Sequence, residues 1–579
     1  MKILPSEILH RIEQRFARLY GSHHAPRLSA RLAQLLSRYP CSEKPPLPAW
    51  NQTDAILTLF ADSILRPKET PLHTLRAFLR DYIGDRFSCL HLQPFFEADE
   101  GEEFAIVDHR RVDPRLGEWG DVEALKPNYA LMFDLVLNQV SRNNVWFRDY
   151  VDGIFPARGY FVSLESDTNL SKVESPFGTP ALSCIQTRRG QRYLWNTFGG
   201  DQFDLDFSNP DVLFELLDIM LGYVSHGASI LQLDSVPFLW KDPDRCSVDL
   251  EEDHELVKIF RDVLSMSAPE VLLLAEAPIS QNRALGYFGE GDESHLLYTH
   301  ALGGLLIHGL LSGRAEFLHQ WLENLPTPPP GCTFVNQTDD PNGIALKPLQ
   351  GLLPPAEFDQ LVHWLKERGA CFPGQGGGHL PPFEANISFF DALSESNQPA
   401  TALAMARLLG AQTLTLALKG IPGIHFPSLV AAHSDHQRCE VTNNPRAANR
   451  PRWQWNDLIP QLEDPATAPA QIFTELLRRI EIRRRQPAFH PDAPQHPLHL
   501  NKGLFGFRRV ALDGHQTIAV VGNFTADVRP IKPDSLIPDL IHYPEKQELL
   551  SGQPLEGREN RDFLLEPYQT IWVAASIPS

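Results

Sequence analysis

Residues 230–236 read ILQLDSV, an apolar run that leads to a carboxylate, Asp234. Runs of this kind, followed by helical patterning, are typical of parallel strands that are buried on both faces. The chain contains seven further runs of the same type, namely AILTLF (55–60), CLHLQPF (89–95), LMFDLVL (131–137), VLLLAEA (271–277), the weaker HLLYTHA (295–301), CTFVNQT (332–338) and GIPGIHF (420–426). Eight such units predict an α/β fold, a closed (β/α)8 TIM barrel, although an open doubly wound sheet has the same periodicity.

Polar residues gather at the carboxyl ends of these runs. They are Asp134, Asn138, Asp234, Glu276, Asp339 and Asp340. In a barrel, this end of the strands is where catalytic groups lie. An open sheet would not need carboxylates repeated there, so the pattern favours the barrel.

The 579 residues suit a barrel with accessory domains. We predict an N-terminal helical extension over 1–50, the barrel over 51–138 and 201–490, an insertion domain after the third strand over 139–200, and a C-terminal antiparallel β domain over 491–579. The last segment has strand composition with turns such as Asp513-Gly514. The glycine run PGQGGGH (373–379) lacks the residues of a phosphate-binding loop, and we interpret it as a flexible active-site loop.

The net charge of −20 argues against binding to nucleic acid or an anionic membrane surface, because both are polyanions. No apolar run reaches the length of a membrane span, and the N-terminus lacks the pattern of a signal peptide. Seven cysteines are scattered without a C-x-x-C pair, which argues against disulfides and a zinc site. We predict a cytoplasmic protein with no metal ion and no cofactor.

Three of the strand-end carboxylates, Asp234, Glu276 and Asp340, could break a glycosidic bond with retention of configuration. One carboxylate attacks the anomeric carbon, and a second protonates the leaving oxygen and later activates the acceptor. A third can stabilise the oxocarbenium-like transition state by its charge. A single strand-end acid is more often a helix cap or part of an ion pair. Three of them favour catalysis.

Several segments together make a more specific pattern, among them FAIVDHRRVDPRLGEWGDVEAL (104–125), LMFDLVLNQVS (131–141), LWNTFGGDQFDLDFSNP (194–210) and ILQLDSVPFLWK (230–241). With them the chain resembles glycoside hydrolase family 13, the α-amylase family, and in particular its sucrose phosphorylase and glucosylglycerate phosphorylase-like branch. The resemblance implies a (β/α)8 barrel that acts on a small α-glucoside. It also implies the transfer of a glucosyl unit to phosphate, water or a small acceptor.

The resemblance also implies roles for individual residues. The nucleophile would be Asp234, the general acid/base Glu276 and the transition-state stabiliser Asp340. Substrate-binding positions would be Asp99 with its arginine partner Arg450, the aromatic residues Phe198 and Phe238, and Gln202. Asp134 and Asn138 match the structural part of a family motif.

Three further predicted substrate-binding positions depart from the family pattern. Gln232 stands where the family has an arginine, and Gln139 and Asp339 stand where it has histidines that bind the sugar. Ionised Asp339 cannot donate a hydrogen bond. In addition, Ser175 and Phe177 stand where relatives have arginines near phosphate. These changes leave two interpretations: an active enzyme with an altered pocket, or a catalytically impaired paralogue that binds a sugar or a partner protein.

Overall fold

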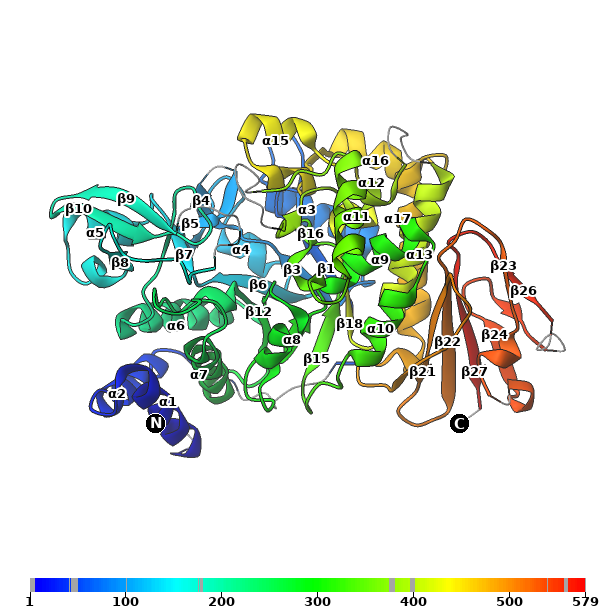
Figure 1. Cartoon of the computed structure of the whole chain (residues 1–579), viewed down its shortest axis with the longest axis horizontal. Helices are drawn as coiled ribbons and strands as arrows, with labels where there is room; N and C mark the ends of the chain where they lie inside the picture. Colours follow the sequence, from blue (N-terminus) through cyan, green and yellow to red (C-terminus); the bar gives the residue numbers. More distant parts are fainter. Residues whose placement is uncertain are drawn as a thin grey trace.

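The computed structural model describes residues 6–40, 42, 50–99, 101–174, 176, 181–373, 381–395, 401–538, 540–556 and 561–577. Eight parallel strands close into a barrel, which confirms the predicted fold and excludes the open sheet (Figure 1). In chain order they are β1 (Ile56–Leu59), β3 (Cys89–Leu92), β6 (Ala130–Val136), β12 (Ala228–Asp234), β13 (Leu272–Ala275), β14 (Leu296–Tyr298), β15 (Thr333–Asn336) and β18 (Ile421–His425). Each of the eight predicted runs overlaps one of these strands.

The strands are almost entirely buried, as expected for parallel strands covered on both faces. One cluster of apolar side chains comes from all eight strands and fills the barrel, with members such as Met132, Ile230, Leu274 and Val335. Because neighbouring strands run parallel and in register, their carboxyl ends meet at one end of the barrel. Gln232, for example, lies beside Asp134 of β6 and Leu274 of β13.

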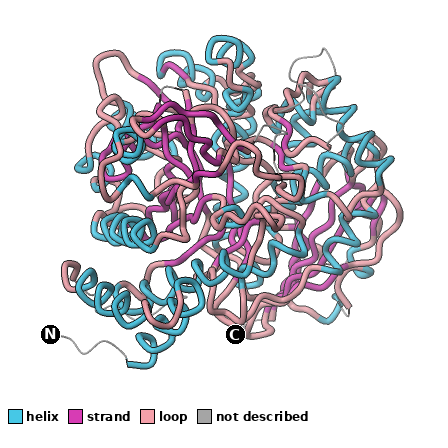
Figure 2. The backbone as a smooth tube through the Cα atoms, turned by 60° about the vertical axis from the view of Figure 1, so that its left-hand side comes forward, coloured by secondary structure: helices cyan, strands magenta, loops and turns pink. Residues whose placement is uncertain are grey.

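A layer of helices surrounds the strands (Figure 2). The main ones are α3 (Pro71–Phe78), α4 (Trp119–Glu123), α6 (Pro210–Ser225), α7 (Glu251–Ser267), α9 (Ala301–Ser312), α10 (Glu316–Asn324), α11 (Pro355–Glu367), α13 (Ala402–Ala417) and α17 (Ala468–Arg484). Their buried faces are rich in leucine and isoleucine and pack into one continuous core with the outer faces of the strands.

Between β6 and β12 the chain leaves the barrel. This segment holds α5 (Val145–Asp152) and a three-stranded antiparallel sheet of β8 (Ser163–Leu164), β10 (Gly190–Trp195) and β9 (Leu182–Thr187). The chain leaves the barrel through β7 (Gln139–Ser141) and returns through β11 (Gln202–Asp204), and these two strands pair with each other. An insertion after the third strand is therefore present, and Figure 1 shows it at the end of the molecule far from the C-terminus.

The C-terminal part forms a six-stranded antiparallel sheet at the opposite end (Figure 1). Its strands are β20 (Gln495–Pro497), β21 (Leu504–Val510), β22 (Gln516–Asn523), β27 (Thr570–Ser576), β24 (Glu545–Glu548) and β25 (Gln553–Pro554). The predicted Asp-Gly turn lies between β21 and β22, where Gly514 has a φ of +75°. The C-terminal β domain is confirmed as an element of the fold, and the exact domain boundaries stay a prediction.

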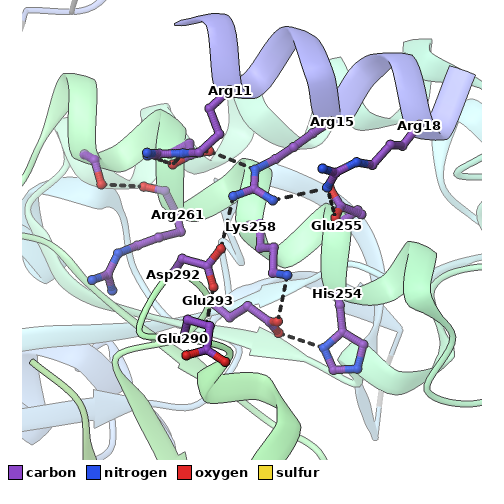
Figure 3. A network of polar contacts seen from close by, with 12 residues as sticks. Arg11, Arg15, Arg18, His254, Glu255, Lys258, Arg261, Glu290, Asp292 and Glu293 are labelled. Carbon is purple, nitrogen blue, oxygen red and sulfur yellow. Dashed lines mark hydrogen bonds and ion pairs between the residues drawn. The ribbon is translucent and has the colours of Figure 1, made fainter. Parts of the chain in front are cut away.

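At the N-terminus, α1 (Ser6–Tyr20) and α2 (Ala25–Leu36) pack against each other as a helical hairpin beside α6 and α7 (Figure 1). Arginines of α1 point at acidic side chains of the barrel layer (Figure 3). Arg15 is 4% exposed and donates to Asp262 at 3.0 Å, to Glu255 at 3.3 Å and to Asp292 at 3.2 Å. The hairpin is therefore held to the barrel by a buried charge network as well as by apolar contacts.

We expect Arg15→Met to weaken the docking of this hairpin by about 3 kcal/mol. The substitution removes the positive partner of a buried ion pair, so the carboxylates that Arg15 contacts lose its charge and its hydrogen bonds. Arg18→Met is the matched control: Arg18 contacts Glu255 at 2.6 Å, but its side chain is 60% exposed, so the loss should stay below about 1 kcal/mol. Hydrogen exchange of the amides in 6–36 measures both. Equal protection in the two variants would contradict the prediction.

The remaining predictions concern membrane spans, metal ligands, cysteines and the glycine-rich loop. Among the described residues, no helix is long and apolar enough to cross a membrane, and no group of three or more His, Cys, Asp or Glu side chains is placed to hold a metal ion. The six described cysteines are free thiols. Most of the predicted glycine-rich loop, residues 374–379, lies outside the described residues, as do Ser175 and Phe177. The cytoplasmic location stays a prediction.

Candidate active site

The three candidate catalytic carboxylates come together at the carboxyl end of the barrel. Asp234 ends β12, Glu276 follows β13 directly, and Asp340 lies in the loop after β15. All three line one cavity of about 320 Å³. The sequence thus predicted correctly that these side chains face the same space, which is large enough for a small sugar.

The backbone after Asp234 turns sharply to bring two of these acids together. Ser235 has a φ of 55°, a left-handed conformation that is uncommon for a residue other than glycine and is often found at functional sites. In this conformation its N–H donates to Oε2 of Glu276 at 3.1 Å. Oδ2 of Asp234 is buried and has no hydrogen-bond partner among the described residues. The turn orients Glu276, and within the described part of the chain one oxygen of Asp234 is left to interact with a substrate.

Burial dominates the electrostatics of the three acids. It raises the pKa of Asp234 to about 6, and the nearby charge of Asp134 adds to this effect. Burial and the charge of Asp234 hold the pKa of Glu276 well above its ordinary value. Burial and the charge of Glu276 raise the pKa of Asp340 to about 8. A carboxyl group that keeps its proton near neutral pH beside one that ionises more readily is the arrangement that acid/base catalysis needs.

Backbone contacts within the loop and with Ala385 fix the loop that carries Asp340. Asp340 forms a bridge with Gly343, and its Oδ1 accepts from the backbone N–H of Asn342 at 2.7 Å. Gly343 has a φ of +98°, and a Cβ at this position would lie 2.4 Å from the carbonyl oxygen of Ala385. Only glycine fits this combination, so the chain specifies the loop that aims Asp340 into the cavity.

Four predicted binding residues also line the cavity: Asp99, Gln139, Phe198 and Gln202. Asp99 accepts hydrogen bonds from Ser141 and, at 2.8 Å, from Nδ2 of Asn143. The prediction for Phe238 needs correction. Phe238 is buried behind the cavity and packs edge-on against Phe198, with their ring centroids 5.5 Å apart, so it supports the aromatic wall and does not form it.

The predicted pair of Asp99 and Arg450 is not formed. Arg450 is 4% exposed, forms its ion pair with Glu103, and donates to the carbonyl oxygen of Pro341 at 3.0 Å. It therefore holds the Asp340 loop from outside the cavity. Another arginine of the same motif, Arg446, lines the cavity instead.

Arg446 makes a two-pronged ion pair with Glu384, in which Nε and Nη2 each lie 2.8 Å from a carboxylate oxygen. Glu384 is 3% exposed and also lines the cavity. Among the described lining residues, Arg446 is the only lysine or arginine, and its positive charge opposes the rise in pKa of Asp234. The sequence analysis did not single out either residue. The motif NPRAANRP offers two arginines four positions apart, and only the fold decides which one faces the site.

Two of the positions that depart from the family pattern, Asp339 and Gln232, do not line the main cavity. Asp339 points to the opposite side from Asp340, as alternation along the backbone allows. Its Oδ2 lies 3.0 Å from Nδ1 of His425, and its Oδ1 accepts a hydrogen bond from the hydroxyl of Ser428 at 2.8 Å. The prediction that Asp339 binds substrate is thus corrected: it is engaged with the neighbouring strand. Gln232 lies under the cavity and accepts from the hydroxyl of Tyr298 at 2.8 Å.

The fold and the cavity define the class of the protein. A closed (β/α)8 barrel with three buried carboxylates at the ends of β12, β13 and after β15, and an aromatic wall beside them, is built to act on glycosidic bonds.

Comparison with known proteins gives the family. The sequence pattern of the alpha-amylase catalytic domain matches residues 81–305. The chain is 34% identical over 99% of its length to a glucosylglycerate phosphorylase of Allomeiothermus silvanus, covering all of that protein. It is 30% identical over 90% of its length to the glucosylglycerate phosphorylase of Escherichia coli, covering 92% of that protein. A crystal structure of a sucrose 6F-phosphate phosphorylase from Thermoanaerobacter thermosaccharolyticum superposes with a TM-score of 0.70 at 21% identity, covering 82% of this chain and 94% of that one.

The chain belongs to the α-amylase family, glycoside hydrolase family 13. It is an α-glucoside-active enzyme of the retaining type, as the three carboxylates predict.

Proposed function

We propose that this enzyme transfers a glucosyl unit between a small glucosylated acid of the glucosylglycerate type and phosphate, with Asp234 as nucleophile, Glu276 as acid/base and Asp340 as stabiliser. The observation that carries the proposal is the convergence of these three acids on one small cavity. The names of two relatives at 34% and 30% identity supply the substrate class.

The reaction would proceed in two displacements. A carboxylate oxygen of Asp234 attacks the anomeric carbon while the glycosidic bond breaks, and Glu276 gives its proton to the departing oxygen. A phosphate oxygen then attacks the same carbon, the bond to Asp234 breaks, and the proton released by phosphate returns to Glu276. The product is α-glucose 1-phosphate. Asp340 stabilises the positive charge of the reacting carbon in both steps, and it must be ionised to do so although burial raises its pKa to about 8.

The charge of the cavity bears on the two anions of this reaction. Seven carboxyl groups of the described residues line it: Asp99, Glu102, Asp201, Asp234, Glu276, Asp340 and Glu384. Arg446 is the positive group among the described lining residues, and because it is paired with Glu384 it would act on a bound carboxylate or phosphate through its positive charge. We therefore propose Arg446 as the residue that balances the charge of glycerate or phosphate.

The test is a product assay with purified protein. It uses glucosylglycerate, glucosylglycerol and sucrose as donors, each with and without inorganic phosphate. We expect α-glucose 1-phosphate from glucosylglycerate only when phosphate is present, at a kcat/KM about tenfold or more above the other donors. Free glucose formed equally with and without phosphate would show that the enzyme hydrolyses its donor and does not catalyse phosphorolysis. No product from any donor would favour the alternative of a catalytically impaired paralogue.

The pKa values predict a bell-shaped pH dependence of kcat/KM. Asp234 must be ionised to attack, and Asp340 must be ionised to stabilise positive charge. Their pKa values are raised to about 6 and about 8, so the rate should fall as the pH drops through this range, and by about tenfold or more per pH unit below about pH 6. Glu276 must carry a proton, and its pKa is raised well above the ordinary value, so the rate should fall again on the alkaline side. Initial rates measured at constant ionic strength between about pH 4 and about pH 9 check both limbs. A rate that is still undiminished at about pH 4 would show that Asp234 does not titrate as described.

A further inference from the structure

The three positions that depart from the family pattern leave the sugar with few hydrogen-bond donors. Gln232 is engaged with Tyr298, and Asp339 is turned toward His425 and Ser428. Gln139 accepts from Asn138 at 3.0 Å, and its amide nitrogen lies 3.5 Å from the carbonyl oxygen of Phe104. A cavity built for a sugar needs other groups to bind its hydroxyls, since an unpaired hydroxyl loses affinity.

His300 occupies a position that can supply one. It follows β14, and β14 lies between β13, which leads to Glu276, and β15, which leads to Asp340. His300 lines the main cavity together with both acids. It also lines a narrow recess of about 10 Å³ that shares Glu276 and Asp340 with the cavity. His300 is therefore flanked by the acid/base and the stabiliser.

The packing of α9 fixes this position. His300 directly precedes α9, and in the first turn of that helix a Cβ added to Gly303 would lie only 1.8 Å from the carbonyl oxygen of Thr338. The helix can approach the Asp340 loop this closely because residue 303 has no side chain. His300 and Asp340 are thus held together by backbone contact between their segments.

The imidazole of His300 is prepared for a neutral polar partner. Its Nε2 is buried and has no hydrogen-bond partner among the described residues. Burial lowers the pKa of His300 to about 4, so the ring is uncharged at neutral pH. An uncharged imidazole offers one N–H donor and one acceptor nitrogen, which matches a sugar hydroxyl. A buried polar atom without a partner costs stability, and such atoms in native proteins call for an explanation.

We propose that His300 binds a hydroxyl of the glucosyl unit between Glu276 and Asp340, and so replaces the hydrogen bonds that family members receive from histidines at positions 139 and 339. This inference deepens the proposed function, but it requires only that the cavity holds a glucosyl unit. The sequence alone did not point to it, because His300 lies in the weakest of the eight strand runs and outside the residues that carry the family resemblance.

The first test measures binding of D-glucose by calorimetry to the wild type, His300→Phe and His300→Gln. We expect His300→Phe to weaken binding by about ten- to hundredfold and His300→Gln by less, because an amide can still donate and accept. The control is His319→Gln, since His319 is another histidine whose pKa is lowered by burial, but its Nε2 is paired with the carbonyl oxygen of Leu504 at 3.1 Å, away from the cavity. Wild-type affinity in His300→Phe would overturn the inference.

The second test identifies the hydroxyl and separates a contact from a structural effect. Glucose and its 2-, 3-, 4- and 6-deoxy analogues are titrated into the wild type and His300→Phe. We expect one analogue to bind the wild type about tenfold more weakly than glucose does, and the variant not to distinguish that analogue from glucose. Equal penalties for every analogue in both proteins would refute the contact. A wild type that binds no glucose and turns over no donor would overturn the proposed function as well, whereas a functional wild type with an unchanged variant would overturn the role of His300 alone.

Discussion

Asp234→Asn is expected to lower kcat/KM about 10⁴-fold or more, the largest effect of any substitution in this chain. The amide has the shape of the carboxylate but lacks the charge that attacks the anomeric carbon, and removal of a nucleophile from a group that acts as a unit removes most of its catalysis. Ser235 and Glu276 can keep their hydrogen bond in the variant, because it involves the backbone of Ser235 and not the side chain of Asp234.

A fluorinated glucosyl fluoride, which forms the glucosyl-enzyme faster than it is consumed, gives the direct measurement. Mass spectrometry should find one glucosyl adduct on the peptide that contains Asp234 in the wild type and none in Asp234→Asn. Asp513→Asn, an exposed position in the turn of the C-terminal sheet, is the control and should form the adduct normally. An adduct on another residue, or full turnover by Asp234→Asn, would remove Asp234 from its proposed role.

The barrel could be predicted from the sequence because its strands are buried on both faces. Strands buried on both faces consist of continuous apolar runs, and ILQLDSV and VLLLAEA are clear examples. The same rule places residues at strand ends together, which is why Asp234 and Glu276 were predicted to meet. The docking of the N-terminal hairpin could not be predicted, because the pairing of Arg15 with Asp262 joins residues far apart in the chain and has no local pattern.

The parts of the site that the sequence missed depend on where loops turn. Arg446 and Arg450 belong to one short motif, and the chain carries no signal that Arg446 faces the cavity while Arg450 pairs with Glu103. Asp339 and Asp340 are adjacent acids, and only their alternation on the loop sends one to His425 and the other into the cavity. Resemblance to a family predicts the role of a residue at a given position, whereas the packing decides the direction in which its side chain points.

Glu276→Gln should separate the two halves of the mechanism. With glucosylglycerate or sucrose the leaving oxygen needs a proton, so we expect kcat/KM to fall about 10³-fold, within the usual range for loss of a general acid. With glucosyl fluoride the leaving group needs no proton, and the first displacement should keep close to the wild-type rate. A comparable loss with both donors would mean that Glu276 acts through the structure of the site and not as an acid.

The acceptor then reports on the second displacement. Ionised phosphate attacks the glucosyl-enzyme without help from a base, whereas water needs one. Glu276→Gln should therefore consume glucosyl fluoride readily with phosphate and slowly without it, and azide should restore turnover by forming α-glucosyl azide, because it attacks the same face as the natural acceptor. Glu384→Gln offers a contrast, since Glu384 also lines the cavity and pairs with Arg446. Its substitution removes a negative charge beside Arg446, so it should strengthen binding of the anionic partner and leave the response to the leaving group unchanged. A leaving-group effect in Glu384→Gln would show that the proton transfer had been assigned to the wrong carboxylate.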